Sequence, residues 1–513
     1  MAGHTRRDFL KTTGAGALAV GLGAHAQPPT ASGAAPTAAQ GPGAGTDPQS
    51  GAGQGRPPTG SLGTVVWRGD PDYEATRRRM VWNARVPDRF PAAIVTVSSD
   101  QDVVAAVKLA RARGLQISMR SGGHNWVGSS LRDGGLTVDL SRLTNVTVDP
   151  AARVAAAQPA IRNTELMAAL GAQGLAFPSG HCPTVAIGGY LLAGGEGWNQ
   201  GSWGPACQSV LAIDLVNADG ELITADAQHY PDLYWMARGV GAGFPGVITR
   251  YHLRVYPAPK VLGLSIYVYP LEQLETIVPW LKSTVGSLAP SVEMMSLMSQ
   301  PPPSVRGQLA DPSARYFNLW PVAFGDSPEE NAAALAPFES APGLDRALVR
   351  QFNASVSWSD LFAIEAAAFP EPARYDVEVA WSNADPLAVL SDLRTRLARA
   401  PSPDTQILAA ITPPPTVDPT AREMAYSLAA PLYVTSYCIW KDAADDAVNM
   451  AWQRETARAL EQFAVGHYIG ETDLTASPTR AAESFAPGVW ERLQAVRQKY
   501  DPQGVFFGHV GQA

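Results

Sequence analysis

Cysteine and charged side chains are scarce in this 513-residue chain. Only three cysteines occur, whereas a secreted domain that depends on disulfides usually has more of them and an even number. Charged residues make up 17% of the chain and the formal net charge is −8, which argues against a nucleic-acid scaffold, since such a protein carries a basic stripe. The rest of the composition is that of an ordinary globular protein of about three domains, or two large ones.

Long apolar runs are also missing. The apolar run 15–24 is too short to span a bilayer, which takes about 20 residues. The paired arginines of Thr5-Arg-Arg-Asp-Phe-Leu-Lys11 are typical of a bacterial twin-arginine signal, and Ala24-His-Ala26 is a small-residue cleavage site. We therefore predict that residues 1–26 are a signal peptide for the twin-arginine export machinery, without a membrane span, and that the mature protein is periplasmic or secreted. An ordinary secretory signal with two arginines by chance is the alternative.

Residues 27–60 contain almost no large apolar side chain. Gly, Ala, Pro, Ser, Thr and Gln dominate the segment. Because such a segment cannot offset the entropy lost on ordering, we predict a disordered linker.

A strand–helix–strand pattern leads to the first glycine-rich loop. Pro91–Ser98 is strand-like, and a serine or aspartate at 98–100 can cap the helix that follows. Gly114 ends this helix and Leu115–Met119 is again strand-like. The apolar face of the helix consists of Val103, Val104, Val107 and Ala110.

The loop itself is Arg120-Ser-Gly-Gly-His-Asn-Trp-Val-Gly-Ser-Ser130. The glycines at 122, 123 and 128 leave room for backbone N–H groups to approach a pyrophosphate closely, and successive amides form an anion-binding nest. A tight turn with an incidental histidine is the alternative for this loop taken alone.

A second glycine cluster, Ile187-Gly-Gly-Tyr-Leu-Leu-Ala-Gly-Gly-Glu-Gly-Trp198, follows Cys182. Val210–Val216 and Glu221–Thr224 then have the pattern of a β-hairpin. The segment 241–246 matches the G-x-G-x-x-G dinucleotide fingerprint, but Pro245 interrupts it and a strand-like segment follows, so we reject a Rossmann domain. Phosphate-loop, zinc-protease and G-x-S-x-G motifs are absent from the sequence.

Four motifs carry a resemblance to a known family. They are R-S-G-G-H from Arg120, G-x-C-P-T-V-x-x-G-G from Gly180, D-L-Y-W-x-x-R-G-x-G with F-x-G-V-I-T from Asp232, and K-Y-D-P-Q-G-V-F from Lys499. In this order they resemble the berberine bridge enzyme-like FAD oxidases, which belong to the vanillyl-alcohol-oxidase (PCMH-type) flavoproteins. The resemblance covers essentially everything after residue 60, and it implies FAD as the cofactor.

The resemblance also implies how FAD is held. His124 matches the histidine bonded to the flavin 8α carbon, and Cys182 matches the cysteine bonded to C6 in members with two linkages. Val185 matches a position beside the reactive carbon where valine leaves room for dioxygen. A hydrogen-bonded core histidine and a small buried thiol are the alternatives for the first two residues. Further residues expected around the cofactor are Arg120, Ser121, Gly122, Gly123, Asn125, Gly128, Ser129, Gly188, Gly189, Gly194, Gly195, Gly197 and Ile248.

Glu196 departs from the family pattern, since many relatives carry a tyrosine or a plain hydrophobe there. A carboxylate near flavin N5 can accept a substrate proton, whereas a structural ion pair or helix cap is the alternative. Tyr468 matches a tyrosine near the substrate hydroxyl, although Gly470 replaces the asparagine usual two residues later. Tyr437 shares one strand face with Tyr433, and this face either lines the pocket or belongs to a half-buried sheet.

The region 259–470 reads as a substrate-binding domain, which follows an FAD-binding PCMH-type domain at 61–258. Its strand candidates are spaced by helical segments, which predicts an antiparallel sheet covered by helices and an α+β fold overall. Residues 471–513 are expected to return to the FAD-binding domain. The strand candidates are Leu262–Tyr269, Arg315–Trp320, Tyr375–Trp381 and Leu432–Trp440.

We therefore expect an exported FAD-dependent oxidase with no metal. Hydride would pass from a C–H bond that bears oxygen or nitrogen to the flavin, with Glu196 or Tyr468 as proton acceptor, and dioxygen would be reduced to hydrogen peroxide. An exported dehydrogenase that passes electrons to a protein or quinone, and a flavin-loaded binding protein, are the alternatives. Sugars, alcohols and amines all remain open as the small-molecule substrate.

Overall fold

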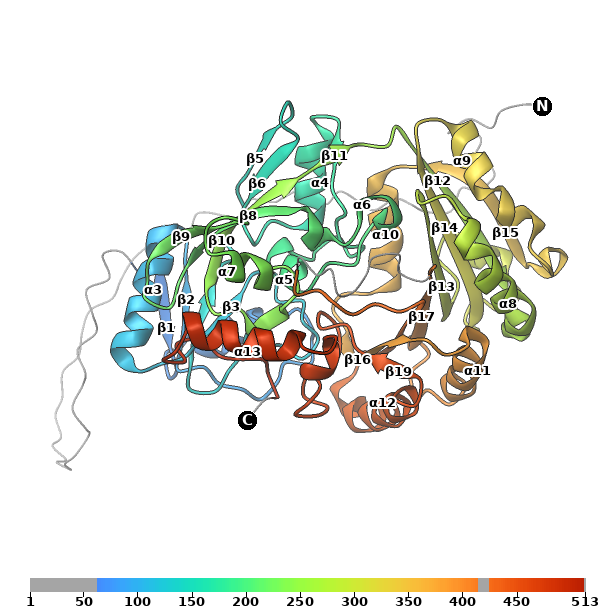
Figure 1. The fold of residues 1–513 in the computed structure, drawn as a ribbon. Coiled ribbons are helices and arrows are strands. Elements are labelled where there is room, and N and C mark those ends of the chain that lie inside the picture. Colours follow the sequence, from blue (N-terminus) through green and yellow to red (C-terminus); the bar gives the residue numbers. More distant parts are fainter. Residues whose placement is uncertain (1–61, 414–423, 512–513) are drawn as a thin grey trace, which may run out of the picture. The chain divides into compact units, whose positions relative to one another are not determined.

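The computed structural model describes residues 62–413 and 424–511, which belong to one compact unit. The predicted signal peptide and linker lie outside these residues. Figure 1 shows the arrangement of the elements: two small sheets near the N-terminal part of the described chain, and one large sheet with its helices.

The first sheet has four strands in the order β1-β2-β4-β3. Helix α3 (Asp100–Arg113) connects β2 to β3 as predicted: Ser99 caps its start by accepting a hydrogen bond from the Asp102 N–H, and Gly114 ends it in the left-handed conformation, with φ of 63°. However, β4 lies between β2 and β3 and is parallel to both. The strands are β1 (Thr64–Trp67), β2 (Ala93–Thr96), β3 (Ile117–Arg120) and β4 (Leu136–Asp139).

The second sheet has five strands in the order β5-β6-β10-β8-β9. The predicted hairpin is confirmed as the antiparallel pair β8–β9. Gly241–Gly243 forms a short 3₁₀ turn and the chain then enters β10, not a helix, which agrees with the rejection of a Rossmann domain. The strands are β5 (Val146–Asp149), β6 (Val154–Ala157), β8 (Val210–Val216), β9 (Leu222–Ala225) and β10 (Val247–Arg254).

Short helices and a two-stranded ladder complete this part of the chain. The ladder pairs β7 (Leu175–Ala176) with β11 (Tyr256–Pro257). The helices are α2 (Tyr73–Arg79), α4 (Asn163–Gly171), α5 (Ile187–Leu192), α6 (Gln200–Trp203) and α7 (Pro231–Met236).

The third sheet has eight strands, all paired antiparallel, in the order β15-β12-β14-β13-β17-β18-β16-β19. Four of them match the predicted strands, and β13, β15, β17 and β19 were not predicted. The strands are β12 (Val261–Tyr269), β13 (Val292–Ser299), β14 (Tyr316–Gly325), β15 (Val349–Val356), β16 (Arg374–Ser382), β17 (Gln406–Ile411), β18 (Leu432–Trp440) and β19 (Ala464–Gly466).

Alternating side chains give this sheet two different apolar faces. On β12, Tyr267 and Tyr269 pack with the helices that cover one face. Leu264 and Ile266 belong instead to the core that includes the second sheet. The covering helices are α8 (Leu274–Thr284), α9 (Pro328–Leu335), α11 (Pro386–Leu397) and α12 (Asp446–Leu460), and Figure 1 shows them on the outer side of the sheet.

The end of the chain contacts the first sheet. Helix α13 (Val489–Tyr500) packs against α7, and Phe506 forms a parallel bridge with Ile117 of β3. The fold is α+β, as the sequence predicts, with the large antiparallel sheet covered by helices on the face away from the first two sheets.

Candidate functional site

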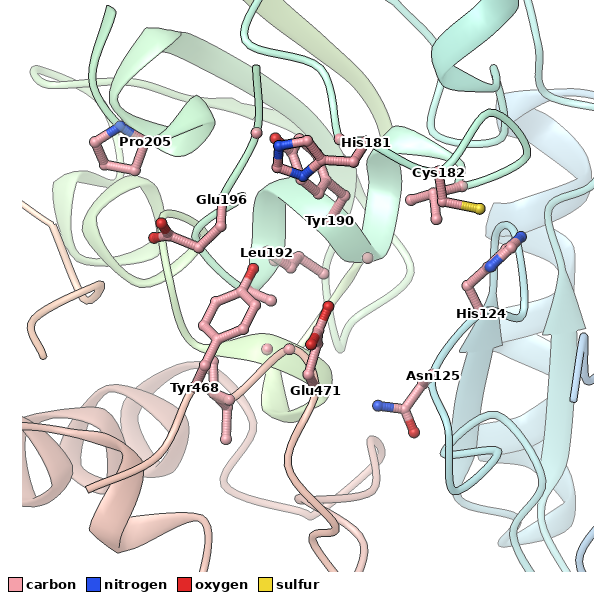
Figure 2. A pocket seen from close by; sticks show the side chains of 18 of the residues that line it. His124, Asn125, His181, Cys182, Tyr190, Leu192, Glu196, Pro205, Tyr468 and Glu471 are labelled. Atoms are coloured by element: carbon pink, nitrogen blue, oxygen red, sulfur yellow. The ribbon is translucent and has the colours of Figure 1, made fainter. Parts of the chain in front are cut away.

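A cavity of about 890 Å³ lies between the glycine-rich loops and the inner face of the eight-stranded sheet. All of the predicted cofactor and catalytic residues line it, except Gly194 and Gly195. Figure 2 shows part of the lining. Its volume is at the upper end of the roughly 300–1,000 Å³ usual for small-molecule and cofactor sites.

The glycines of the first loop are required by close packing. A Cβ at Gly122 would lie 2.9 Å from the Cβ of Ala186, and one at Gly123, where φ is +76°, would lie 2.6 Å from the Met80 carbonyl oxygen. Gly189 differs, because a Cβ there would meet nothing within 4 Å and the residue borders the cavity. Close packing against protein atoms therefore explains Gly122 and Gly123, whereas Gly189 leaves backbone open to the cavity, as the close approach of a pyrophosphate requires.

Two arginines line the same end. Arg120 faces Asp139 at 3.4 Å, yet its buried Nε has no hydrogen-bond partner among the described residues. Arg132 donates to the Gly508 carbonyl at 2.7 Å. Burial lowers the pKa of both guanidinium groups, although both stay cationic at neutral pH. An anionic group such as the pyrophosphate of FAD fits this end of the cavity by charge as well as by shape.

Thr184 brings the two candidate attachment residues together. Its hydroxyl lies 3.1 Å from His124 Nε2 and 3.7 Å from Cys182 Sγ. The imidazole stacks on Trp82 with centroids 4.8 Å apart, and burial lowers the pKa of His124 to about 3, so the ring is neutral. Burial also raises the pKa of the Cys182 thiol. Figure 2 shows the imidazole and the sulfur side by side at one edge of the pocket.

Glu196 lies at the opposite side of the pocket in Figure 2. Tyr426 donates a short hydrogen bond to Oε1, and Gln200 Nε2 donates to Oε2 at 2.5 Å. Burial raises the pKa of Glu196 in spite of these two donors. Neither of the structural alternatives is seen, because the carboxylate forms no ion pair with an arginine in 62–413 or 424–511 and caps no helix there.

Gly194 and Gly195 pack the loop that carries Glu196 and stay outside the cavity. A Cβ at Gly194 would lie 2.4 Å from the Tyr426 ring, and both glycines have positive φ, of 116° and 84°. The Gly195 N–H donates to the Tyr468 hydroxyl at 3.1 Å, so this loop fixes the orientation of the Tyr468 phenol.

Tyr433 and Tyr437, on the predicted face of β18, line the cavity. The hydroxyls of Tyr433 and Tyr437 both donate to Glu471 Oε2, at 2.9 and 3.0 Å. Burial raises the pKa of Glu471 against the effect of these donors. In Figure 2, Glu471 projects into the pocket between the pair His124–Cys182 and the side that holds Glu196.

Among the polar residues of this lining, the sequence did not point to His181, Glu293, Glu365 or Glu471. His181 and Glu293 pair at 2.5 Å, and although burial opposes the charge, Glu293 raises the pKa of His181 to about 9. Glu365 lines the cavity from a distant part of the chain, whereas Tyr426, which the sequence also did not predict, lies outside the lining and donates to Glu196. A lone acid in the apolar helical run Leu361–Ala368 is a signal that points to Glu365, whereas no local pattern marks the others.

Neither a metal centre nor a membrane-spanning helix is found in the described residues. No group of three or more His, Cys, Asp or Glu side chains within 62–413 and 424–511 is placed to hold a metal ion. In the same part of the chain, no helix is both long enough and apolar enough to cross a membrane.

Comparison with known proteins agrees with this geometry. Residues 91–226 match the FAD binding domain family, and residues 3–23 match the twin-arginine translocation signal. The crystal structure of 6-hydroxy-D-nicotine oxidase from Arthrobacter nicotinovorans aligns with a TM-score of 0.75 and 22% identity, over 88% of this chain and 98% of that one. The berberine bridge enzyme of Eschscholzia californica aligns with a TM-score of 0.74 and 17% identity, over 88% and 96%. The fold is therefore that of the berberine bridge enzyme-like, PCMH-type flavoproteins.

Sequence similarity extends over almost the same length. FAD-linked oxidoreductase nodO of Hypoxylon pulicicidum is 30% identical over 452 residues, which are 87% of this chain and 97% of that protein. The chain belongs to the FAD-linked oxidoreductases. It is an oxidoreductase that binds FAD, and its twin-arginine signal directs it to the periplasm or out of the cell.

Proposed function

We propose that FAD is bonded covalently to His124 and Cys182. The observation that carries this proposal is the Thr184 hydroxyl, which lies 3.1 Å from His124 Nε2 and 3.7 Å from Cys182 Sγ. Imidazole and thiolate are nucleophilic enough to add to an electrophilic flavin carbon. The raised pKa of Cys182 means that the thiolate forms only when the cofactor or a base assists its ionisation.

We propose further that the protein is an oxidase. When bound, FAD accepts a hydride from a substrate C–H bond and delivers the electrons to dioxygen, which gives hydrogen peroxide. Val185 lines the cavity three residues after Cys182. It stands where the family resemblance implies that valine leaves room for dioxygen, which supports an oxidase. A protein of similar fold, 6-hydroxy-D-nicotine oxidase, is an oxidase, and this likeness supports the proposed reaction class.

In this reaction Glu196 accepts the proton of the substrate O–H or N–H. Burial raises the pKa of Glu196, which makes its carboxylate a stronger proton acceptor, and Tyr426 and Gln200 hold the carboxylate in one orientation. Tyr468 and Tyr437 position the substrate through their hydroxyls. Glu471 is a second candidate for the base, because it lines the same cavity, burial raises its pKa, and Figure 2 shows its carboxylate between the attachment pair and Glu196.

Acid precipitation followed by oxygen-electrode measurement tests the proposal. Yellow colour that stays with the precipitated protein is expected from a covalent flavin, whereas release into the supernatant contradicts the linkage. Sugars, alcohols and amines are then screened for oxygen consumption with hydrogen peroxide as product. Rapid anaerobic bleaching of the flavin with negligible oxygen consumption would favour the alternative, a dehydrogenase that uses a protein or quinone acceptor.

Glu196→Gln and Glu471→Gln separate the two candidate bases. Loss of the proton acceptor lowers the rate of flavin reduction by about 10²- to 10⁴-fold, and only the variant that removes the acceptor shows this loss. A small effect in both variants would remove both residues from the proposed role.

A further inference from the structure

Charge is unevenly distributed in the cavity. The cations Arg120 and Arg132 lie at the end formed by the first glycine-rich loop and the C-terminal segment. Four carboxylates line the remainder: Glu196, Glu293, Glu365 and Glu471. His181 lies beside these carboxylates and forms an ion pair with Glu293.

Three of these carboxylates have protein partners. Glu196 accepts from Tyr426 and Gln200, and Glu471 accepts from Tyr433 and Tyr437. Glu293 accepts from His181 at 2.5 Å and from the Asn199 N–H at 2.7 Å. Glu365, on α10 (Trp358–Ala368), is different: its side chain makes no hydrogen bond or ion pair with any residue in 62–413 or 424–511.

An unpartnered carboxyl in this position is costly. Glu365 is only 4% exposed and its carboxyl opens onto the cavity, so a polar group there costs about 1–3 kcal/mol unless the contents of the cavity supply a hydrogen bond. Such a group is retained where a ligand supplies the missing partner. Glu365 borders the cavity from α10 and not from the glycine-rich loops expected to hold FAD, which favours the substrate of the proposed reaction as that ligand.

We propose that Glu365 binds a cationic nitrogen of the substrate, and that the protein acts on amines. This inference rests on the proposed function and adds the substrate class to it. A carboxylate without a donor among the described residues favours an ammonium over a neutral hydroxyl, because a hydrogen bond between two charged groups is about twice as strong as one between neutral groups. Glu293 adds negative potential at Glu365, whereas the protonated His181 opposes it. Aromatic faces in the same lining, among them Phe369 and Tyr437, also attract an ammonium group.

Binding of three matched probes tests the proposal without turnover. Benzylammonium, benzyl alcohol and benzoate share one ring and differ in charge. Each is titrated anaerobically into the purified protein at pH 8, and binding is followed by calorimetry and tryptophan fluorescence, with flavin absorbance as an additional signal. We expect benzylammonium to bind at least about 10-fold more tightly than benzyl alcohol, and benzoate most weakly.

Glu365→Gln keeps the size of the side chain and removes its charge. We expect it to weaken benzylammonium binding by about 10- to 100-fold and to leave benzyl alcohol binding unchanged, which also shows that the pocket is intact. Glu455→Gln is the matched control, since Glu455 is 73% exposed and does not line the cavity. It should leave all three affinities unchanged.

Equal binding of the three probes to the wild-type protein, or equal losses for benzylammonium and benzyl alcohol in Glu365→Gln, would overturn the proposal. Equal losses of benzylammonium binding in Glu471→Gln and Glu365→Gln would also overturn it, because the negative potential of the whole cavity, and not Glu365 in particular, would then account for the binding. The outcome is independent of the proposed oxidase activity: a protein that binds benzylammonium through Glu365 but retains no covalent flavin would contradict only the proposed function.

Discussion

Replacing Glu365 with glutamine should stabilise the substrate-free protein above neutral pH. Burial raises the pKa of Glu365 from 4.5 to about 7, with Glu293 adding to the rise and His181 opposing it. The folded protein therefore holds a proton on Glu365 between about pH 4.5 and pH 7, which the unfolded chain has already released. The free energy of unfolding falls as the pH rises through this window, and glutamine removes the fall because it does not titrate.

The magnitude follows from the size of the pKa shift. Each unit corresponds to about 1.4 kcal/mol, so the wild-type protein loses at most about 3 kcal/mol on Glu365 by pH 8. Glutamine restores this amount at pH 8 and changes little at pH 5, where the carboxyl is protonated in the folded state. His181 stays protonated across this range because its pKa is about 9, so the difference between the two pH values reports on Glu365.

Urea unfolding followed by tryptophan fluorescence at pH 5 and pH 8 measures the effect. Glu455→Gln again serves as control and should match the wild-type protein at both pH values, since Glu455 is exposed. A Glu365→Gln protein that is less stable than the wild type at pH 8, or that differs from it equally at both pH values, would refute the reasoning. It would indicate that Glu365 has a partner in the folded protein.

Three further changes probe the pocket. Thr184→Val removes the hydroxyl at 3.1 Å from His124 and should slow covalent incorporation of flavin into the apoprotein by about 2- to 10-fold. The rate is measured as acid-stable colour against time, and an unchanged rate would contradict a role for this contact. Tyr426→Phe removes a donor that lowers the pKa of Glu196. The acidic limb of the pH profile of kcat/KM, measured with the best screened substrate, should therefore move up by about one to two pH units, and an unchanged limb would exclude Glu196 as the base. Gly123→Ala places a side chain at a residue with positive φ and should reduce flavin retention and lower the free energy of unfolding by at least about 1 kcal/mol. Flavin content and urea unfolding measure the two effects, and full flavin retention would mean that the loop shifts without loss of cofactor binding.

The parts of the fold that follow from local pattern could be predicted from the sequence. The Ser99 cap, the Gly114 stop and the β8–β9 hairpin depend on neighbouring residues, and all three are present. In contrast, β13 (Val292–Ser299) is rich in Met and Ser and lacks a clear alternation of apolar and polar residues. It becomes a strand because it pairs with β14 and β17 on both sides, which a local pattern does not reveal.

The residues of the candidate site also divide into those that the sequence could predict and those that it could not. His124, Cys182 and the glycines around them stand in continuous motifs, so the sequence could place them together. Glu365 reaches the cavity, and Tyr426 reaches Glu196, only through the packing of distant elements. Tyr426 and Glu196 are 230 residues apart in the chain, and the Glu365 side chain has no hydrogen-bond partner among the described residues. Burial and the lack of a partner are tertiary properties, and no spacing in the sequence encodes them.

Peptide mapping by mass spectrometry tests the central claim most directly. The exported, mature protein is digested and its yellow peptides are sequenced. Our account predicts that one flavin joins the peptide that contains His124 to the peptide that contains Cys182, and that Cys182→Ser leaves the flavin on the His124 peptide alone. Recovery of both peptides without flavin, with FAD free in solution, would contradict it.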